Sequence, residues 1–345
     1  EDEAMPILSR KWVIATALVI GLAVIGGIVK ALLPSEENQL ETLRVVEVTR
    51  SPFYAPQYVA LSKGFFEEEG LDIRLSNGFG GDKTMTALLA GDADIVLVGV
   101  EAAIYVNARG ASSPVTAFAQ LTQTDGSFLV SREPMEDFRW SDLRGKALLG
   151  QRKGGMPQMV SEYVQRKNGL NPHKDVKIIQ NVDYKNLGSA FASGTGDFAQ
   201  LFEPTASMLE KEGKGYVVAS FGVDSGKLPY TAYIARAQFI EDHPEVIHRF
   251  VRALHRAQQW TLRHSPEEIS DAISPYFTDT DREVLIRVVK RYQSQESWAP
   301  DPIIERSEYE HLLEVMRQAG ELPGNIPYEK IVRTDIAEAV TGNPD

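Results

Sequence analysis

The hydrophobic pattern of this chain opens with one long apolar segment. Trp12 to Val29 is a run of apolar or small residues that is interrupted only by Thr16, and basic residues stand on both sides of it. Extended to Leu33, such a run rises about 1.5 Å per residue as a helix, roughly enough to cross the hydrocarbon core of a bilayer. The pattern predicts a single transmembrane helix over residues 12–33.

The flanks of this segment indicate its orientation. Arg10 and Lys11 precede it and Glu36 and Glu37 follow it, so the positive-inside rule places the C-terminal bulk outside the cytoplasm. A cleaved signal peptide has a shorter apolar core and small residues at its cleavage site, whereas the best site here contains the larger Val29. We expect a retained single-pass anchor in the cell membrane, with the soluble domain on the extracytoplasmic side.

The anchor is expected to have a short flank on each side. Residues 1–11 form the N-terminal flank, whose acidic opening Glu1-Asp2-Glu3-Ala4 before Met5 looks like an expression remnant and is set aside. Residues 34–42 form a polar linker to the soluble part.

Beyond the linker, the pattern alternates between strand-like and helical runs. Strand-like runs cover residues 43–48, 71–75 and 95–98, and helical runs cover residues 57–69 and 83–90. Strands and helices that alternate at this spacing predict βαβ units and a parallel sheet. The loops that follow the strands lie at the edge where open α/β sheets bind ligands.

A second set of strands and helices follows, and after it the chain is helical to its end. Two short strands, residues 128–131 and 231–235, join the two sets. We therefore expect an α/β protein of two lobes that are connected twice. Lobe 1 would consist of residues 43–130 and 231–345, and lobe 2 of residues 131–230.

The amino-acid composition excludes several kinds of functional site. The chain has no cysteine, which excludes disulfides, thiolate nucleophiles and cysteine-based zinc sites. Its net charge of −12 argues against nucleic acid as a partner. The six histidines show no metal-ligand spacing, and no G-x-S-x-G, Walker or HExxH motif occurs. We expect a protein that is not an enzyme and has no catalytic residues, metal or cofactor.

Several segments of the soluble part resemble a known family. They are residues 51–60 (SPFYAPQYVA), 63–73 (KGFFEEEGLDI), 87–95 (ALLAGDADI), 142–146 (DLRGK) and 202–204 (FEP). They resemble the nitrate/sulfonate/taurine and thiamin-pyrimidine-precursor (NMT1/THI5-like) solute-binding proteins that serve ABC importers. The resemblance extends from about Leu43 to Ala319.

This resemblance implies a fold and a role. The fold would be the two-lobed periplasmic-binding-protein type II arrangement, or Venus flytrap, which closes on one small solute by a hinge motion. The partners would be that solute and an ABC permease with its ATPase in the membrane.

Two glutamates are the leading candidates for contact with a solute. Glu101 and Glu203 each follow an apolar strand, on different lobes, so closure should bring their carboxylates to one site. Carboxylates there would bind a cation or an N–H-rich heterocycle. The alternative is that each only caps a helix, since carboxylates favour helix N-termini. For Glu203 the resemblance favours the ligand role, because pyrimidine-precursor binders use the carboxylate of this segment on their ligand.

The loops after the strands supply aromatic and glycine candidates. Phe53, Tyr54 and Phe79 could stack on a planar solute or contact a cation. Gly80 and Gly81 could let the backbone approach the solute, although the pair also suits a plain turn. Tyr58, on a helix, is expected to belong to the core instead.

Other candidates lie on the second lobe and at the connections. The segment Lys153, Gly154, Gly155 opens a helix whose free N–H groups could bind an anionic group, with Lys153 as an alternative solvated charge. Gln123 and Tyr230 stand beside the two connecting strands and are either solute contacts or structural hydrogen-bonding groups. Phe202 completes the candidate set.

Three kinds of protein fit this pattern to different degrees. The first is the binding component of an importer, for a small planar or cationic nitrogen-containing solute similar to a pyrimidine precursor. Its variant is a sulfonate or nitrate binder, which would need Arg and Lys in its site. The second is a pyrimidine-synthase-like enzyme, for which the resemblance implies a cysteine-rich pattern that this chain lacks. The third is a sensory ectodomain.

Overall fold

The computed structural model describes residues 40–324 and 326–342. The expected anchor over residues 12–33 and most of the linker lie outside the described residues. Within the described ranges, no helix is both long and apolar enough to cross a membrane. The description below therefore concerns the part of the chain that begins at Leu40.

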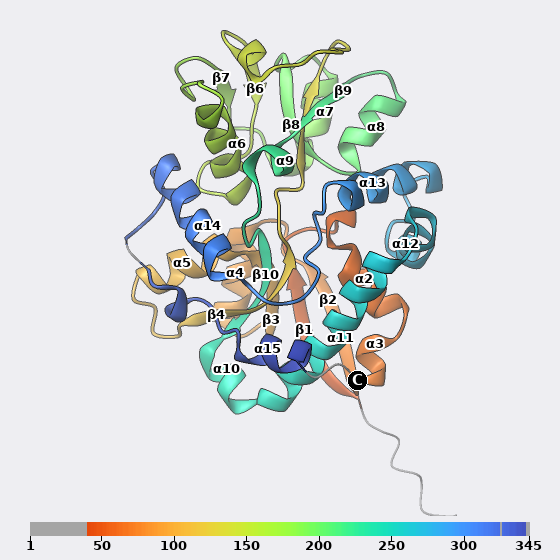
Figure 1. The fold of residues 1–345 in the computed structure, drawn as a ribbon, viewed down its shortest axis with the longest axis vertical. Helices are drawn as coiled ribbons and strands as arrows, with labels where there is room; N and C mark the ends of the chain where they lie inside the picture. The colour runs from red at the N-terminus through yellow and green to blue at the C-terminus, as the bar shows by residue number, and fades with distance from the viewer. Residues whose placement is uncertain (1–39, 325, 343–345) are drawn as a thin grey trace, which may run out of the picture. The chain divides into compact units, whose positions relative to one another are not determined.

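The first sheet is built from strands that come before and after the second sheet in the chain (Figure 1). Its strands follow the order β2-β1-β3-β10-β4. β1 is parallel to β2 and β3, and β10 is antiparallel to both β3 and β4. The bounds are β1 (Glu41–Glu47), β2 (Leu71–Asn77), β3 (Ile95–Gly99), β4 (Val115–Thr122) and β10 (Thr231–Arg236).

The second sheet repeats this plan. Its order is β7-β6-β8-β5-β9, with β6 parallel to β7 and β8 and with β5 antiparallel to β8 and β9. In each sheet, therefore, the strand that enters from the other lobe is inserted antiparallel beside a parallel set. The bounds are β5 (Ser127–Ser131), β6 (Ala147–Leu149), β7 (Lys177–Ile179), β8 (Phe198–Phe202) and β9 (Tyr216–Ser220).

Two passages connect the sheets, which confirms the two-lobed prediction. Residues 123–126 lead from β4 to β5, and residues 226–230 lead from the end of α9 to β10. All five residues of β5 pair with β8 in the second sheet. The expected lobe boundary between residues 130 and 131 thus falls inside β5, and the chain changes lobe at residues 123–126.

Helices cover both sheets (Figure 1). The expected helix over residues 57–69 is two helices, because Gly64 adopts a left-handed conformation (φ 72°) between them. Tyr58 is fully buried, as expected for a core residue. The helices are α2 (Ala55–Ser62), α3 (Phe65–Glu68), α4 (Gly81–Ala90), α5 (Val100–Ala108), α6 (Met156–Lys167), α7 (Leu187–Ala192), α8 (Thr205–Lys211), α9 (Phe221–Ser225), α10 (Ala237–Asp242), α11 (Pro244–Arg263), α12 (Pro266–Ile273), α13 (Arg282–Ser294), α14 (Arg306–Ala319) and α15 (Asp335–Gly342).

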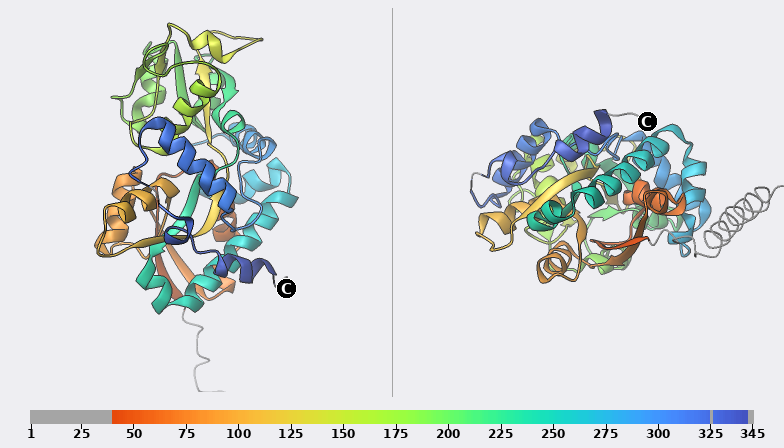
Figure 2. Two further views of the ribbon diagram at one scale, coloured as in Figure 1. Left: turned by 60° about the vertical axis from the view of Figure 1, so that its left-hand side comes forward. Right: turned by 90° about the horizontal axis from the view of Figure 1, so that it is seen from below.

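The C-terminal helices contact both lobes (Figure 2). α14 packs on α6 of the second lobe, and its Glu308 accepts a hydrogen bond from Gln120 on β4 of the first. α13 packs on α8 as well as on the first-lobe turn η1 (Pro52–Tyr54). Between them, the Ala299 N–H donates to the Leu121 carbonyl beside the first passage. The residues near the passages are consequently enclosed by segments from distant parts of the chain.

Candidate functional site

The two lobes meet where β3 ends and α6 begins. Glu101 lies in the first turn of α5, directly after β3, and its Oε1 accepts a hydrogen bond from the Met156 N–H of the second lobe at 3.3 Å. The Tyr105 hydroxyl donates to the Gly154 carbonyl at 3.0 Å. Because both hydrogen bonds run from one lobe to the other, we take this lobe junction as the candidate solute site.

Glu101 combines burial with an unused acceptor. Glu101 is 8 % exposed, and its Oε2 has no hydrogen-bond partner. Burial raises the pKa of this carboxyl to about 7, whereas the N–H groups of Glu101, Met156 and Ala102 act in the opposite direction. A buried oxygen of this kind is costly unless a donor reaches it.

Asp125, in the first passage, has the same character. It is fully buried, its Oδ1 accepts from the Ser127 N–H at 2.6 Å, and its Oδ2 has no partner. Burial raises the pKa of Asp125 to about 7, whereas the Ser127 groups and the nearby Tyr230 hydroxyl act in the opposite direction. Asp125 is not among the candidates named from the sequence. No pattern marked it, because its burial depends on segments far along the chain.

Tyr230 lies near both carboxyls. It lies in the second passage, is 3 % exposed, and its hydroxyl lacks a partner of good geometry. Burial raises its pKa well above the ordinary value, and both Asp125 and Glu101 raise it further. Tyr230 thus lies within electrostatic reach of both carboxyls, as expected for a residue at the lobe junction.

A third unused acceptor lies on β8. Gln200 is fully buried, and its Nε2 donates to the Ser127 hydroxyl at 2.8 Å and to the Pro157 carbonyl at 2.9 Å. Its Oε1 has no partner. Ser127 therefore joins Gln200 to Asp125 in one buried polar network.

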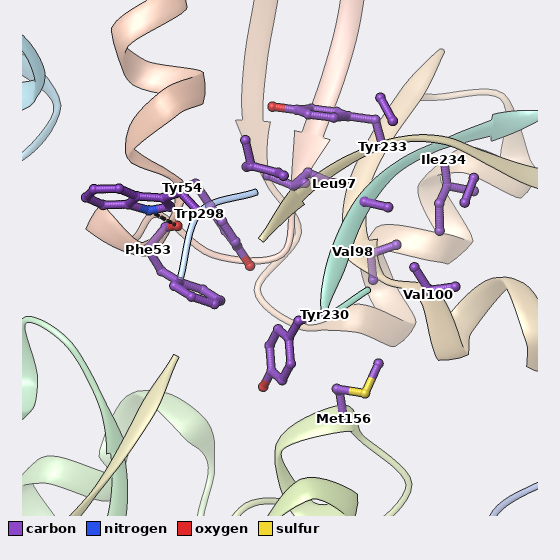
Figure 3. Packing of buried hydrophobic residues seen from close by; sticks show 14 of the residues in the cluster. Phe53, Tyr54, Leu97, Val98, Val100, Met156, Tyr230, Tyr233, Ile234 and Trp298 are labelled. Carbon is purple, nitrogen blue, oxygen red and sulfur yellow. Dashed lines mark hydrogen bonds between the residues drawn. The ribbon is translucent and has the colours of Figure 1, made fainter. Parts of the chain in front are cut away.

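Aromatic side chains cluster near the passages between the lobes, and Figure 3 shows Phe53, Tyr54 and Tyr230 among them. The Phe53 ring centroid lies 5.7 Å from that of Tyr54, 6.1 Å from that of Phe202 and 5.6 Å from that of Tyr230. The Tyr184 ring, 43 % exposed, lies 5.9 Å from Phe202. Four of the sequence candidates are thus brought together, and Tyr184 is an addition that the sequence did not single out.

Glu203 differs from the expectation. Its carboxylate accepts bonds of 2.8 Å from the Ser207 N–H, the Ser207 hydroxyl and Arg291, and its side chain has no exposed surface. The donors come from α8 and α13, so the group caps one helix and ties another to it. These contacts are those of the helix cap that was given above as the alternative, and no hydrogen bond within the described residues joins Glu203 to Glu101.

The remaining candidates lie at the edge of the site or outside it. Lys153 is 76 % exposed and faces Glu321 at 3.8 Å. Gln123 donates to the Glu296 carbonyl at 2.8 Å and so fixes the first passage. Phe79 is 75 % exposed with φ of 55° and takes no part in the aromatic cluster.

The candidate glycines act through the backbone. Gly80 and Gly155 are the N-caps of α4 and α6, Gly81 begins α4, and Gly154 supplies the carbonyl that Tyr105 contacts. No group of three potential metal-ligating side chains occurs within residues 40–324 and 326–342.

One further buried carboxyl lies below the site. Glu47 ends β1, and its Oε2 accepts from the Tyr58 hydroxyl at 2.6 Å and from Gln57 at 2.8 Å. Burial raises its pKa to about 7, against the effects of Tyr58, Arg50 and Gln57. The sequence did not indicate that this carboxyl is buried, because the burial results from Gln57 and Tyr58 on α2, which packs over the end of β1.

Comparison with known proteins identifies the family. The NMT1/THI5-like family model matches residues 51–269. YtlA of Bacillus subtilis (strain 168), named as a candidate binding protein, is 52 % identical over 327 residues, which cover 94 % of this chain and 98 % of YtlA. The chain belongs to the NMT1/THI5-like family.

More distant matches include an enzyme and a binding protein. The 4-amino-5-hydroxymethyl-2-methylpyrimidine phosphate synthase of Candida albicans (strain WO-1) is 24 % identical, over 63 % of this chain and 66 % of its own length. The structure of the alkanesulfonate-binding protein SsuA from Xanthomonas axonopodis pv. citri, bound to MOPS, matches with a TM-score of 0.69 at 15 % identity, over 86 % of this chain and 99 % of SsuA. The latter likeness shows the shared two-lobed fold.

Proposed function

We propose that this protein is the extracytoplasmic solute-binding component of an ABC importer and captures a small nitrogen-containing solute, planar or cationic, between its lobes. It would deliver that solute to a membrane permease and its ATPase. The family, the two-lobed fold and the 52 % identity to YtlA support the general role. The chemistry of the lobe junction supports the solute class.

The observation that carries the solute class is a set of buried oxygens without partners. Glu101 Oε2, Asp125 Oδ2 and Gln200 Oε1 are all unpaired acceptors in the described residues around the junction. An acceptor buried without a donor costs free energy, on the order of 1–3 kcal/mol, and more if it is charged. A solute rich in N–H groups would satisfy several of them at once, and a cation would offset the charge of the two carboxylates.

The basic side chains near the junction point to the same class. Arg291 is engaged by Glu203 and Glu210, and Lys153 extends into solvent toward Glu321. A bound sulfonate or nitrate would need a positively charged side chain beside it, and at this junction it would instead lie next to buried carboxylates. The aromatic rings of Tyr54, Phe202 and Tyr230 instead suit the flat face of a heterocycle or a cation.

The proposed solute site is tested by binding measurements on matched variants. A thermal-shift screen of small amines, amidines and aminopyrimidines identifies a solute, and titration calorimetry gives its affinity. Glu101→Gln and Asp125→Asn should each weaken binding about tenfold or more, because a charge-assisted hydrogen bond becomes a neutral one.

The control is Glu162→Gln, a buried carboxyl on α6 that already has partners in Gln158, Arg166 and His173. Its affinity for the solute should equal that of the unaltered protein. Equal affinity in all variants, or tight binding of an alkanesulfonate by the unaltered protein, would contradict the proposed solute class.

The sequence supports a membrane location for this binding protein. We propose that the apolar run Trp12–Leu33 is retained as its anchor. The full chain should then sediment with membranes and resist extraction by high salt, and release of a mature form that lacks this run would contradict the anchor.

A further inference from the structure

Two helices from different lobes begin next to the same carboxylate. α5 starts at Val100 in the first lobe and α6 starts at Met156 in the second. Their N-caps, Gly99 and Gly155, have no side chain that could accept a hydrogen bond from the first turn. Helix starts without a side-chain cap leave N–H groups in need of an acceptor.

The Glu101 carboxylate lies beside the first turn of both helices. Its Oε1 receives the Met156 N–H of α6, and the N–H groups of Glu101 and Ala102 in α5 are near enough to favour its charged form. The side chain is more than nine-tenths buried, with Oε2 still unpaired. The carboxylate is therefore held at the place where two helix dipoles present their positive ends.

Gly99 makes room for this carboxylate. Its backbone angles, φ −61° and ψ 140°, are open to any residue, so the conformation does not require glycine. A Cβ at this position, however, would overlap both oxygens and the carboxyl carbon of Glu101. The glycine is thus explained by the position of the carboxylate.

A pair of helix N-termini is an arrangement that binds anions. We propose that Glu101 is the specificity-determining residue of the lobe junction: its carboxylate occupies the anion position of the two helix N-termini and so excludes anionic solutes. The inference rests on the proposed function, since it concerns the same solute site. It adds that the preference against sulfonates and similar anions resides largely in one side chain.

The inference predicts a gain of function that a structural role does not. Removal of the carboxylate frees the N–H groups at both helix starts, so Glu101→Ala should bind sulfate and methanesulfonate at least about tenfold more tightly than the unaltered protein does. If Glu101 only stabilised the fold, the same variant would lose stability and gain no anion affinity.

A second variant moves the carboxylate without removing it. Gly99→Ala should displace the Glu101 side chain from the helix starts and also raise the affinity for the two anions, by a smaller factor. The double variant Gly99→Ala/Glu101→Ala should bind them as well as Glu101→Ala, because no carboxylate remains to be displaced. Gly99→Ala also serves if Glu101→Ala fails to fold.

Calorimetry with sulfate and methanesulfonate decides the question. Gain of anion binding in Glu101→Ala or Gly99→Ala supports the inference, even if the screen finds no nitrogen-containing solute and the proposed solute class fails. No gain in either folded variant overturns the inference, while binding of an amine by the unaltered protein would leave the proposed function intact. Tight anion binding by the unaltered protein overturns both.

Discussion

Glu101 and Glu203 occupy equivalent places in the two lobes and differ in every contact. Each follows an apolar strand at the edge of its sheet, and each is almost fully buried. Glu203 is enclosed by donors from Ser207 and Arg291, whereas Glu101 keeps one oxygen without a partner and reaches across to the other lobe. Position after a strand therefore predicts where a carboxylate lies, and its partners decide what it does.

The largest expected effect of a substitution is the loss of stability at Glu203. Glu203→Ala leaves the half-buried Arg291 with Glu210 and the Ser207 hydroxyl as its remaining partners and removes the cap of α8. Breaking a buried ion pair on one side should lower the free energy of unfolding by about 3 kcal/mol. Urea denaturation measures this change.

The affinity of the folded Glu203→Ala variant for the solute should be unchanged. A variant with full stability and lost binding would reverse the comparison and make Glu203 the solute contact.

The sequence could predict the lobes but not this division of roles. Alternating strands and helices predicted two α/β sets with parallel strands, and the resemblance motifs predicted the family. The strands β4 and β9 and the antiparallel pairs of β5 and β10 were not predicted. The ion pair of Glu203 with Arg291 was not predictable, because Arg291 lies 88 residues further along the chain. Asp125 was missed for the same reason: its burial arises only when the passage, β5 and Tyr230 come together.

The positions of the connecting strands were predicted more closely than the lobe boundary. The hydrophobic pattern of residues 128–131 marks a buried strand and matches β5. It does not tell which sheet the strand joins, since that depends on hydrogen bonds with β8 and β9. Glu47 shows the same limit, because its burial results from Tyr58 and Gln57 on a helix that packs over the strand end.

The next effect is a dependence of stability on pH, which is shared among three buried carboxyls. In the folded protein, burial raises the pKa of Glu47, Glu101 and Asp125 to about 7, while unfolded carboxyls titrate near 4. The folded state therefore binds more protons between about pH 4 and 7, and the free energy of unfolding should fall as pH rises through that range. Thermal denaturation from acid to neutral pH measures the slope.

Glu47→Gln isolates one part of that slope. The amide keeps an oxygen that can accept from Tyr58 and Gln57 but no longer titrates, so the decline with pH should become shallower. The polar partners of Glu47 are Gln57, Tyr58 and Arg50, which all belong to the first lobe. The Glu47→Gln variant should therefore keep the same preference between amines and anions. A stability that rises from pH 5 to 7 would contradict the burial of these three carboxyls.

The smallest expected effect is at Lys153, the basic residue that the sequence placed at the start of α6. Its side chain is 76 % exposed and its ion pair with Glu321, at 3.8 Å, is screened by water and salt. Lys153→Ala should change the free energy of unfolding by less than about 0.5 kcal/mol and the affinity for the solute by less than about twofold. Calorimetry at low and at physiological salt checks both, and Lys153→Gln serves as the matched neutral variant.

A loss of affinity of tenfold or more in both variants would place Lys153 in the solute site. That site would then need a positive charge, and the contrast between an acceptor-rich junction at Glu101 and a satisfied carboxylate at Glu203 would no longer explain the choice of solute.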